Sequence, residues 1–335
     1  MNSFFQKLLF IGLMLGLQLS AKAAISYDFE GFVRVSAQKE LFVQWQKADA
    51  RKPTVVLLNG LTYSTVQWNE FAQALHNHGI GVVQYDMTGM GQTLLKYAPI
   101  RDVITYQTQI QELKALIGKL KLTRANLVGL SYGGGLAIAF AGAYPQSVKN
   151  VILMAPYTEP LGTQDLWIKM QVLSTRMMFP YNPYSNDELY DYFLRMNVYT
   201  TYPQAEPVVL ENPYKLEATF RMAQGVRSLD TEKSIATAPE KSVHLVIAGS
   251  DEYIDRSVLE KFWTNVPESA KASKTIILGT KHKIPENIPQ FSADWVATIL
   301  ESTRHVQNGR IFEANSATGV VRSESGDEFV IGTKN

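Results

Sequence analysis

The chain of 335 residues contains no cysteine. This absence excludes disulfide bonds, thiolate metal sites, a cysteine nucleophile and a lipid anchor attached to cysteine. A domain of this size buries enough apolar surface to fold without disulfides. The missing cysteine therefore restricts the chemistry of the chain without arguing against a folded domain.

The chain also lacks an excess of charge of either sign. Lysine and arginine total 32, aspartate and glutamate total 31, and hydrophobic residues make up 46% of the sequence. A nucleic-acid-binding protein usually carries a basic patch, and no basic run interleaved with aromatic residues occurs here. The composition is that of a globular protein, and no nucleic-acid partner is predicted.

The N-terminus resembles a secretory signal. Lys7 precedes an apolar run of 12 residues, Leu8–Leu19, which is shorter than the ~20 residues of a membrane span. Ala21-Lys22-Ala23 fits the A-x-A pattern of a signal cleavage site. We expect residues 1–23 to be a cleaved signal, with an uncleaved anchor as the alternative. The protein is then periplasmic or secreted, bacterial, and without stable membrane insertion after cleavage.

Short apolar runs alternate with helical patterns after the signal, which predicts an α/β fold with a mostly parallel, doubly wound sheet. An opening hairpin adds an antiparallel edge. Strands are expected at residues 29–35, 41–45, 54–58, 81–85, 125–130, 150–154, 243–248 and 275–278. Helices are expected at residues 65–78, 102–120, 132–144, 257–264 and 295–301.

The alternation stops between about residues 157 and 230, a stretch that holds 8 of the 16 tyrosines. We expect a helical insertion in which most of these aromatic side chains form a small core. The predicted organisation is a core domain in two parts, residues 24–156 and 236–304, with a helical insertion at residues 157–235 between them. A polar tail follows at residues 305–335. Two short β-like pieces in the tail leave open an added hairpin or an unordered end.

The most informative segment runs from a buried strand into Gly129-Leu130-Ser131-Tyr132-Gly133 and then into a helix. This is the G-x-S-x-G nucleophile elbow in its strand–turn–helix context. The turn is so sharp that the residues two before and two after the serine must lack bulk. Ser131 is therefore the predicted nucleophile, with a structural serine in a glycine-rich turn as the alternative.

A serine hydroxyl needs a histidine base, which in turn needs an acid to orient it. The chain has five histidines. His76 and His78 end an early helix, His244 lies inside an apolar strand, and His305 follows the last helix. His282 remains, on the loop after the final strand, and is the predicted base; an exposed loop histidine is the alternative.

The acid is expected between the serine and the histidine in the chain. Asp251 comes first after the strand at 243–248 and is the predicted acid. Asp255 fits better as the N-cap of the following helix, and Glu252 remains a third candidate.

An oxyanion hole needs two backbone N–H donors. Tyr132 follows the nucleophile and supplies one. The loop Asn59-Gly60-Leu61-Thr62 follows the first buried strand, and the amide of Leu61 is the predicted second donor. The alternative is a plain turn at a strand end.

From about residue 28 to 303 the chain resembles the α/β-hydrolase superfamily, through the elbow after the fifth strand and the order Ser131, Asp251, His282. The resemblance implies an eight-stranded sheet and identifies the insertion after the sixth strand as a lid. Within the superfamily the chain is most similar to lid-bearing esterases and monoacylglycerol-lipase-like enzymes.

Two positions depart from the commonest pattern of this superfamily. Thr88 replaces arginine in a D-x-R-G-x-G loop, and Asn59 stands where histidine is commonest. Neither change removes a backbone donor. The serine nucleophile argues against the dehalogenase and epoxide-hydrolase branches, which use aspartate.

The sequence thus predicts a serine hydrolase that cleaves a carboxylic ester of a small apolar substrate through an acyl-enzyme on Ser131. No cofactor or metal is expected, and the predicted partner is the small-molecule ester. A non-catalytic binding protein on the same fold is the alternative from another class. Lactone, amide or carbon–carbon hydrolysis and acyl transfer on the same triad also stay open, as does the oligomeric state.

Overall fold

In the computed structural model the described residues are 25–159, 162–205, 212–301 and 306–332. The predicted signal, residues 1–23, lies outside them. The described residues form one sheet with eleven strands. The strands are β1 (Phe29–Arg34), β2 (Glu40–Gln46), β3 (Thr54–Leu58), β4 (Gly81–Asp86), β5 (Ala125–Leu130), β6 (Val148–Met154), β7 (Val243–Ala248), β8 (Lys271–Ile277), β9 (Arg310–Ala314), β10 (Val320–Ser323) and β11 (Glu328–Val330).

The strand order in space is β1-β2-β4-β3-β5-β6-β7-β8-β9-β10-β11. The pairs from β4–β3 through β8–β9 are parallel, while β1–β2, β2–β4, β9–β10 and β10–β11 are antiparallel. The predicted fold class, a mostly parallel α/β-hydrolase sheet with an antiparallel opening hairpin, is confirmed. The expected count of eight strands is wrong, because the tail adds β9, β10 and β11 to the edge of the sheet.

Helices and 3-10 turns cover both faces of the sheet, since the strands are apolar on both sides. In β3, for example, Val56 and Leu58 point into one buried cluster, and Val55 and Leu57 into the other. The helical elements are η1 (Thr65–Trp68), α2 (Asn69–His76), α3 (Gly91–Tyr97), α4 (Tyr106–Lys119), α5 (Tyr132–Ala143), η2 (Pro145–Ser147), α6 (Gly162–Met178), α7 (Asn186–Ala205), α8 (Lys215–Val226), α9 (Thr231–Ile235), α10 (Arg256–Asn265), α11 (Ile284–Asn287) and α12 (Pro289–Glu301).

Helix boundaries differ from the expected ones where local capping decides them. The helix expected from residue 102 begins at Tyr106, because the Thr105 side chain accepts a hydrogen bond from the Thr108 amide and caps it. The last core helix begins at Pro289 rather than at residue 295, since proline is well suited to a first helical position. The α3 helix is not foreseen by the sequence pattern.

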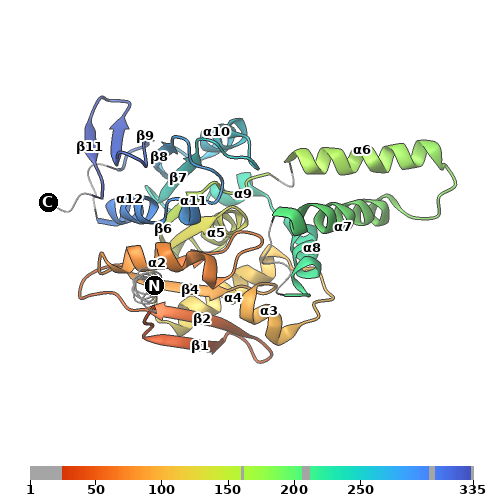
Figure 1. Ribbon diagram of the computed structural model, residues 1–335, viewed down its shortest axis with the longest axis horizontal. Coiled ribbons are helices and arrows are strands. Elements are labelled where there is room, and N and C mark those ends of the chain that lie inside the picture. Colours follow the sequence, from red (N-terminus) through yellow and green to blue (C-terminus); the bar gives the residue numbers. More distant parts are fainter. Residues whose placement is uncertain (1–24, 160–161, 206–211, 302–305, 333–335) are drawn as a thin grey trace, which may run out of the picture.

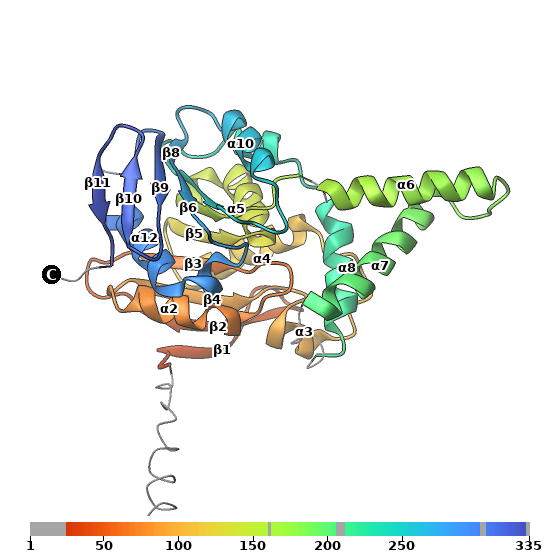
Figure 2. The same ribbon diagram turned by 45° about the horizontal axis from the view of Figure 1, so that its top comes forward.

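The chain between β6 and β7 forms α6, α7, α8 and α9. Figures 1 and 2 show α6 and α7 extending away from the sheet as a pair, with α8 beside the near end of α7. A small apolar cluster, including Ile168, Leu194 and Phe220, holds the three longer helices together. The expectation that most aromatic side chains of this insertion form its core is wrong, because five of its seven described tyrosine side chains are exposed.

The strand order places two strand ends side by side at the centre of the sheet. β3 lies between β4 and β5 in the sheet. The chain therefore passes from β3 to β4 on one side and then crosses to β5 on the other side of β3. Leu58 at the end of β3 pairs with Gly129 of β5. Open α/β sheets bind ligands where the strand order switches in this way. The loops after β3 and β5 therefore meet at the expected position of a site.

Candidate active site

Ser131 occupies a strained turn between β5 and α5. Its backbone has φ 50° and ψ −114°, a conformation that residues with a side chain rarely adopt. The surroundings hold this conformation, because the Ser131 amide donates to the Met154 carbonyl at 3.0 Å and the Tyr157 amide donates to the Ser131 carbonyl at 2.8 Å. The side chain is half-buried and borders a pocket.

The two glycines of the elbow are required by close backbone contacts. A β-carbon on Gly129 would lie 2.4 Å from the Gly133 oxygen, and one on Gly133 would lie 2.1 Å from the Leu58 oxygen. Both distances are far below van der Waals contact. The G-x-S-x-G pattern thus reflects packing of the turn against the end of β3 as well as the turn's own geometry.

His282 and Asp251 are hydrogen-bonded to each other. His282 Nδ1 lies 2.8 Å from Asp251 Oδ2 and 3.0 Å from Oδ1. The side chains are 9% and 3% exposed, so the pair is shielded from water. A carboxylate at Nδ1 assigns the proton to that nitrogen, which leaves Nε2 as an acceptor. This is the tautomer that a general base requires.

The three acid candidates have different partners. Asp251 Oδ1 accepts hydrogen bonds from the Tyr253 and Ile254 amides, which fix the carboxylate facing the imidazole. Glu252 Oε2 accepts from the backbone amide of His282 at 3.1 Å and so holds the loop rather than the ring. Asp255 accepts from the Ser257 amide at 2.7 Å and caps α10.

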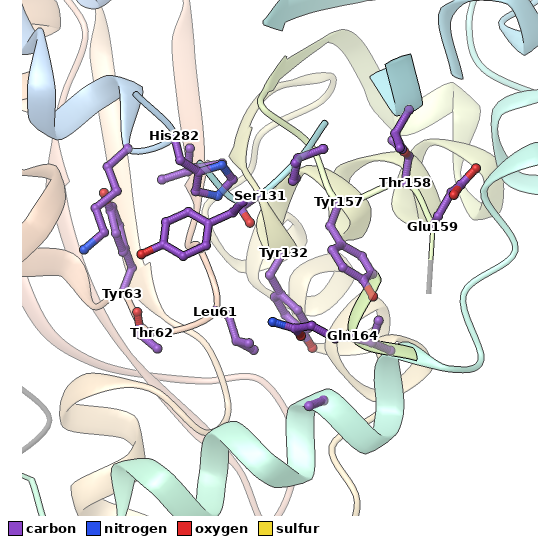
Figure 3. A pocket seen from close by; sticks show the side chains of 18 of the residues that line it. Leu61, Thr62, Tyr63, Ser131, Tyr132, Tyr157, Thr158, Glu159, Gln164 and His282 are labelled. Atoms are coloured by element: carbon purple, nitrogen blue, oxygen red, sulfur yellow. The ribbon is translucent and has the colours of Figure 1, made fainter. Parts of the chain in front are cut away.

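Ser131 and His282 border the same pocket, and Figure 3 shows both side chains at one end of it. Among the described residues no hydrogen bond joins the Ser131 hydroxyl to the imidazole. Catalytic hydrogen bonds in free enzymes are often longer than in complexes. The ring of Tyr253 packs edge-on against His282, with centroids 5.1 Å apart.

Leu61 and Tyr132, the predicted oxyanion donors, line this pocket beside Ser131. Tyr132 is the first residue of α5, and amides in the first turn of a helix have no intrahelical acceptor. Its N–H therefore remains available to a ligand at the pocket, and the dipole of α5 favours negative charge there. Leu61 follows the end of β3, whose loop reaches the same place.

Buried side chains brace the loop that carries Leu61. Asn59 is fully buried; its Nδ2 donates to the Tyr85 carbonyl, and its Oδ1 accepts from Trp68 Nε1 at 2.8 Å. Asp86, 1% exposed, accepts from the Thr65 amide at 2.7 Å. No sequence motif signals the Trp68 contact, which depends on η1 folding back over the loop.

Asp86 also accepts from the Gln92 amide at the start of α3, so one carboxylate joins two loops. Burial raises the pKa of Asp86 to about 6, although the Gln92 and Thr65 amides and the charge of Lys215 favour the carboxylate. The D-x-T-G-x-G pattern points to this residue, but its partners are visible only in the structure.

A second brace lies behind Tyr132. The Tyr132 hydroxyl donates to Gln109 Oε1 at 2.7 Å, and Gln109 Nε2 donates to the Thr88 carbonyl. The Tyr106 ring stacks on the Tyr132 ring at 4.7 Å, and its hydroxyl donates to the Tyr132 carbonyl. Thr88 Oγ1 donates to Glu112 Oε1, and burial raises the pKa of that carboxyl. These contacts fix both the side chain and the backbone carbonyl of Tyr132, the first residue of α5.

The pocket has a volume of about 210 Å³. Its floor is the sheet edge at Ser131, and its far wall includes Ala223 and Val226 of α8, while Gln164 at the start of α6 borders one side (Figure 3). Sites for drug-sized ligands usually measure about 300–1,000 Å³. The cavity therefore fits a small molecule, and its wall comes partly from the helical insertion.

The described residues contain no group of three or more histidine, cysteine, aspartate or glutamate side chains placed to hold a metal ion. None of the described helices has both the length and the apolar content needed to cross a bilayer.

Comparison with known proteins identifies the family. Residues 49–288 match the family described as serine aminopeptidase, S33. The chain belongs to this family. Members share the α/β-hydrolase fold, so the resemblance drawn from the elbow and the Ser–Asp–His order is confirmed.

A proline iminopeptidase from Clostridioides difficile (strain 630) is 31% identical over 144 residues, which cover 42% of this chain and 47% of the relative. The chain thus spans less than half the length of the curated relatives it matches. An α/β-hydrolase enzyme from a Medee basin deep-sea metagenome library superposes with a TM-score of 0.61 at 19% identity, covering 82% of this chain and 98% of that one. An esterase from Exiguobacterium antarcticum superposes with a TM-score of 0.60 at 16% identity, covering 82% of this chain and 100% of the esterase. These two structural matches establish the fold alone.

Proposed function

We propose that this S33-family hydrolase cleaves a carboxylic ester of a small apolar substrate through an acyl-enzyme on Ser131. The observation that carries the proposal is the strained Ser131 at the rim of a small pocket that it shares with an imidazole held by Asp251. The strain has a role in such a site, because it presents the hydroxyl to the cavity.

The reaction begins when the Ser131 hydroxyl attacks the ester carbonyl and His282 Nε2 takes its proton. Asp251 stabilises the resulting imidazolium through Nδ1. The amides of Leu61 and Tyr132 donate to the oxyanion of the tetrahedral intermediate. The intermediate collapses as His282 protonates the departing alcohol, and water then releases the acid with His282 as base.

An aminopeptidase would have to bind the protonated α-amino group of its substrate, which requires an available carboxylate near the serine. Among the described residues that line the pocket, the carboxylates belong to Glu159 and Asp255. Glu159 pairs with Lys261 at 2.9 Å, and Asp255 caps α10. With both acids engaged, the remaining apolar wall favours a neutral acyl group over a charged amine.

The proposal includes export and a lid role for the helical insertion. Export rests on the signal-like residues 1–23 alone. The lid role is supported by the position of α8, whose Ala223 and Val226 line the pocket opposite the sheet edge.

The test is a substrate panel with matched variants. Purified protein is assayed on p-nitrophenyl acetate, butyrate, octanoate and palmitate, and on proline p-nitroanilide. We expect turnover of the esters with a preference for short or medium acyl chains, because the pocket is small. Ser131→Ala should lower ester turnover by about 10³-fold or more. Ser250→Ala removes an exposed serine beside Asp251 and should leave turnover unchanged.

The alternatives give different results. Faster turnover of the prolyl anilide than of any ester would identify an aminopeptidase and refute the ester proposal. No turnover of any substrate by a folded wild-type protein would favour a binding protein on the hydrolase fold.

A further inference from the structure

The exposed apolar side chains of this protein are concentrated on one part of it. The described residues include 21 large hydrophobic or aromatic side chains that are exposed, and 12 of these lie between residues 166 and 199, on α6, α7 and the turn that joins them. Soluble proteins rarely expose contiguous apolar surface without a partner. This helical pair therefore needs an explanation that the pocket does not provide.

The apolar surface of α6 is a regular stripe. Leu166, Met170, Leu173 and Met177 are 61%, 54%, 54% and 76% exposed. Their spacing of four, three and four residues places them on one face of a helix. We call these four residues the α6 stripe.

The stripe faces away from the protein. The residues of α6 that pack against the rest of the insertion are Ile168 and Val172, which are buried. At 100° per residue they lie on the side of the helix opposite to the stripe. Figures 1 and 2 show α6 running out from the sheet with nothing packed along its outer side.

Few charges lie along this surface. From residue 166 to 185 the only charged side chains are Lys169 and Arg176, and no aspartate or glutamate occurs. Lys169 pairs with Asp165 at the start of the helix, and Arg176 donates to backbone carbonyls of the following turn. Acidic residues resume at Asp187. The stripe itself therefore carries no charge, and the outer end of the hairpin, where Arg176 is followed along the chain by Asp187 and Glu188, has no net positive charge.

The turn at the outer end carries side chains typical of a membrane interface. Phe179, Tyr181 and Tyr184 are 60%, 97% and 58% exposed, and Trp167 near the start of α6 is 40% exposed. Tyrosine and tryptophan combine an apolar ring with a polar group, which suits the headgroup region of a bilayer. An interface between two protein copies would not need a nearly fully exposed tyrosine at a projecting tip.

We propose that the α6 stripe and the turn after it dock onto the surface of a phospholipid bilayer. The stripe enters the headgroup region, and the aromatic side chains of the turn lie at its boundary. The association is peripheral and leaves the helix in the plane of the surface. Because Gln164 borders the pocket, docking would hold the near end of α6, and so the pocket rim, close to the lipid. The inference is independent of the proposed ester hydrolysis.

The test measures co-sedimentation of the full chain with vesicles of equal parts phosphatidylcholine and phosphatidylglycerol, and with vesicles of phosphatidylcholine alone. Wild type should bind both kinds of vesicle, because docking depends on apolar and aromatic side chains. The stripe variant combines three substitutions, Met170→Ser, Leu173→Ser and Met177→Ser. Its partitioning onto the vesicles should be roughly 100-fold weaker than that of wild type, since each lost side chain weakens it about fivefold. Leu95→Ser/Val103→Ser, also at exposed apolar positions, should bind as wild type does.

A second readout locates the contact. Brominated phosphatidylcholine should quench a component of the tryptophan fluorescence that is absent from Trp167→Phe, because Trp167 lies beside the stripe. This signal reports on α6 whatever other part of the chain meets the lipid.

Three results would overturn the proposal. One is failure of wild type to bind either kind of vesicle. Another is failure of the readouts that locate the contact on α6, so that the stripe variant binds as wild type does or no quenching is assigned to Trp167. The third is a dimeric wild type and a monomeric stripe variant by light scattering, without vesicle binding, which would make the stripe an interface between two copies of the chain.

Discussion

The buried carboxyl of Asp86 gives a quantitative prediction about stability and pH. Burial raises its pKa from 3.8 to about 6 in the folded protein. A raised pKa means that the fold favours the protonated form, so the contribution to stability is fully present below about pH 4 and is lost as the pH rises through 6. The shift of about two pKa units corresponds to about 3 kcal/mol.

The perturbation is Asp86→Asn, which keeps the shape of the side chain and removes the titration. Asparagine has one acceptor oxygen, whereas the Asp86 carboxylate accepts from both the Thr65 and Gln92 amides. The variant therefore loses one hydrogen bond, at a cost of about 1–3 kcal/mol that does not depend on pH. The unfolding free energy of wild type minus that of the variant should fall by about 3 kcal/mol between pH 4 and pH 8.

Urea unfolding followed by circular dichroism measures both proteins at both pH values. Asp102→Asn, at an exposed aspartate, controls for the loss of one carboxyl charge. A difference that stays constant with pH would refute the reasoning, because the carboxyl would then titrate alike in both states. A difference that rises with pH would show that the two amides outweigh burial.

Three further predictions concern the site. Asp251→Asn should lower kcat by about 10³- to 10⁴-fold in an ester assay because the imidazole loses its orienting acid, whereas Asp255→Asn should change kcat less than about tenfold; equal losses would contradict the choice of acid. Gly133→Ala should abolish activity or yield no folded protein, since its β-carbon would lie 2.1 Å from a backbone oxygen of β3. Gly118→Ala, with open space around it, should leave activity and folding intact, and an active Gly133→Ala protein would refute the steric argument. Asn59→Ala should lower the unfolding free energy by about 2–3 kcal/mol in urea, because it leaves a buried indole N–H and a carbonyl unpaired; a loss below 0.5 kcal/mol would contradict this.

The parts of the fold that the sequence could predict are those determined locally or by strand periodicity. The elbow at Ser131 is readable because steric crowding allows only glycine two residues to either side. The core strands are readable because they are apolar on both faces. His282 could be selected because four other histidines fall on early helices, a buried strand or the chain after the last helix.

What the sequence could not predict depends on contacts between distant segments. β9 is short and gains its place by pairing with β8, so an eleven-stranded sheet is not apparent from periodicity. The contact of Trp68 with Asn59 and the two amides on Asp86 need the folded loops. α6 has apolar residues on two sides, and periodicity does not show which side packs against the protein. The exposed stripe therefore cannot be predicted from the sequence.

Covalent labelling by a fluorophosphonate, read by intact mass and peptide mapping, tests directly whether Ser131 is an activated nucleophile. We expect one adduct per chain, located on Ser131, with slow labelling in His282→Ala and none in Ser131→Ala. Ser250→Ala should label as wild type does. A folded wild-type protein that forms no adduct, or forms it on another serine, would show that Ser131 is not the activated nucleophile.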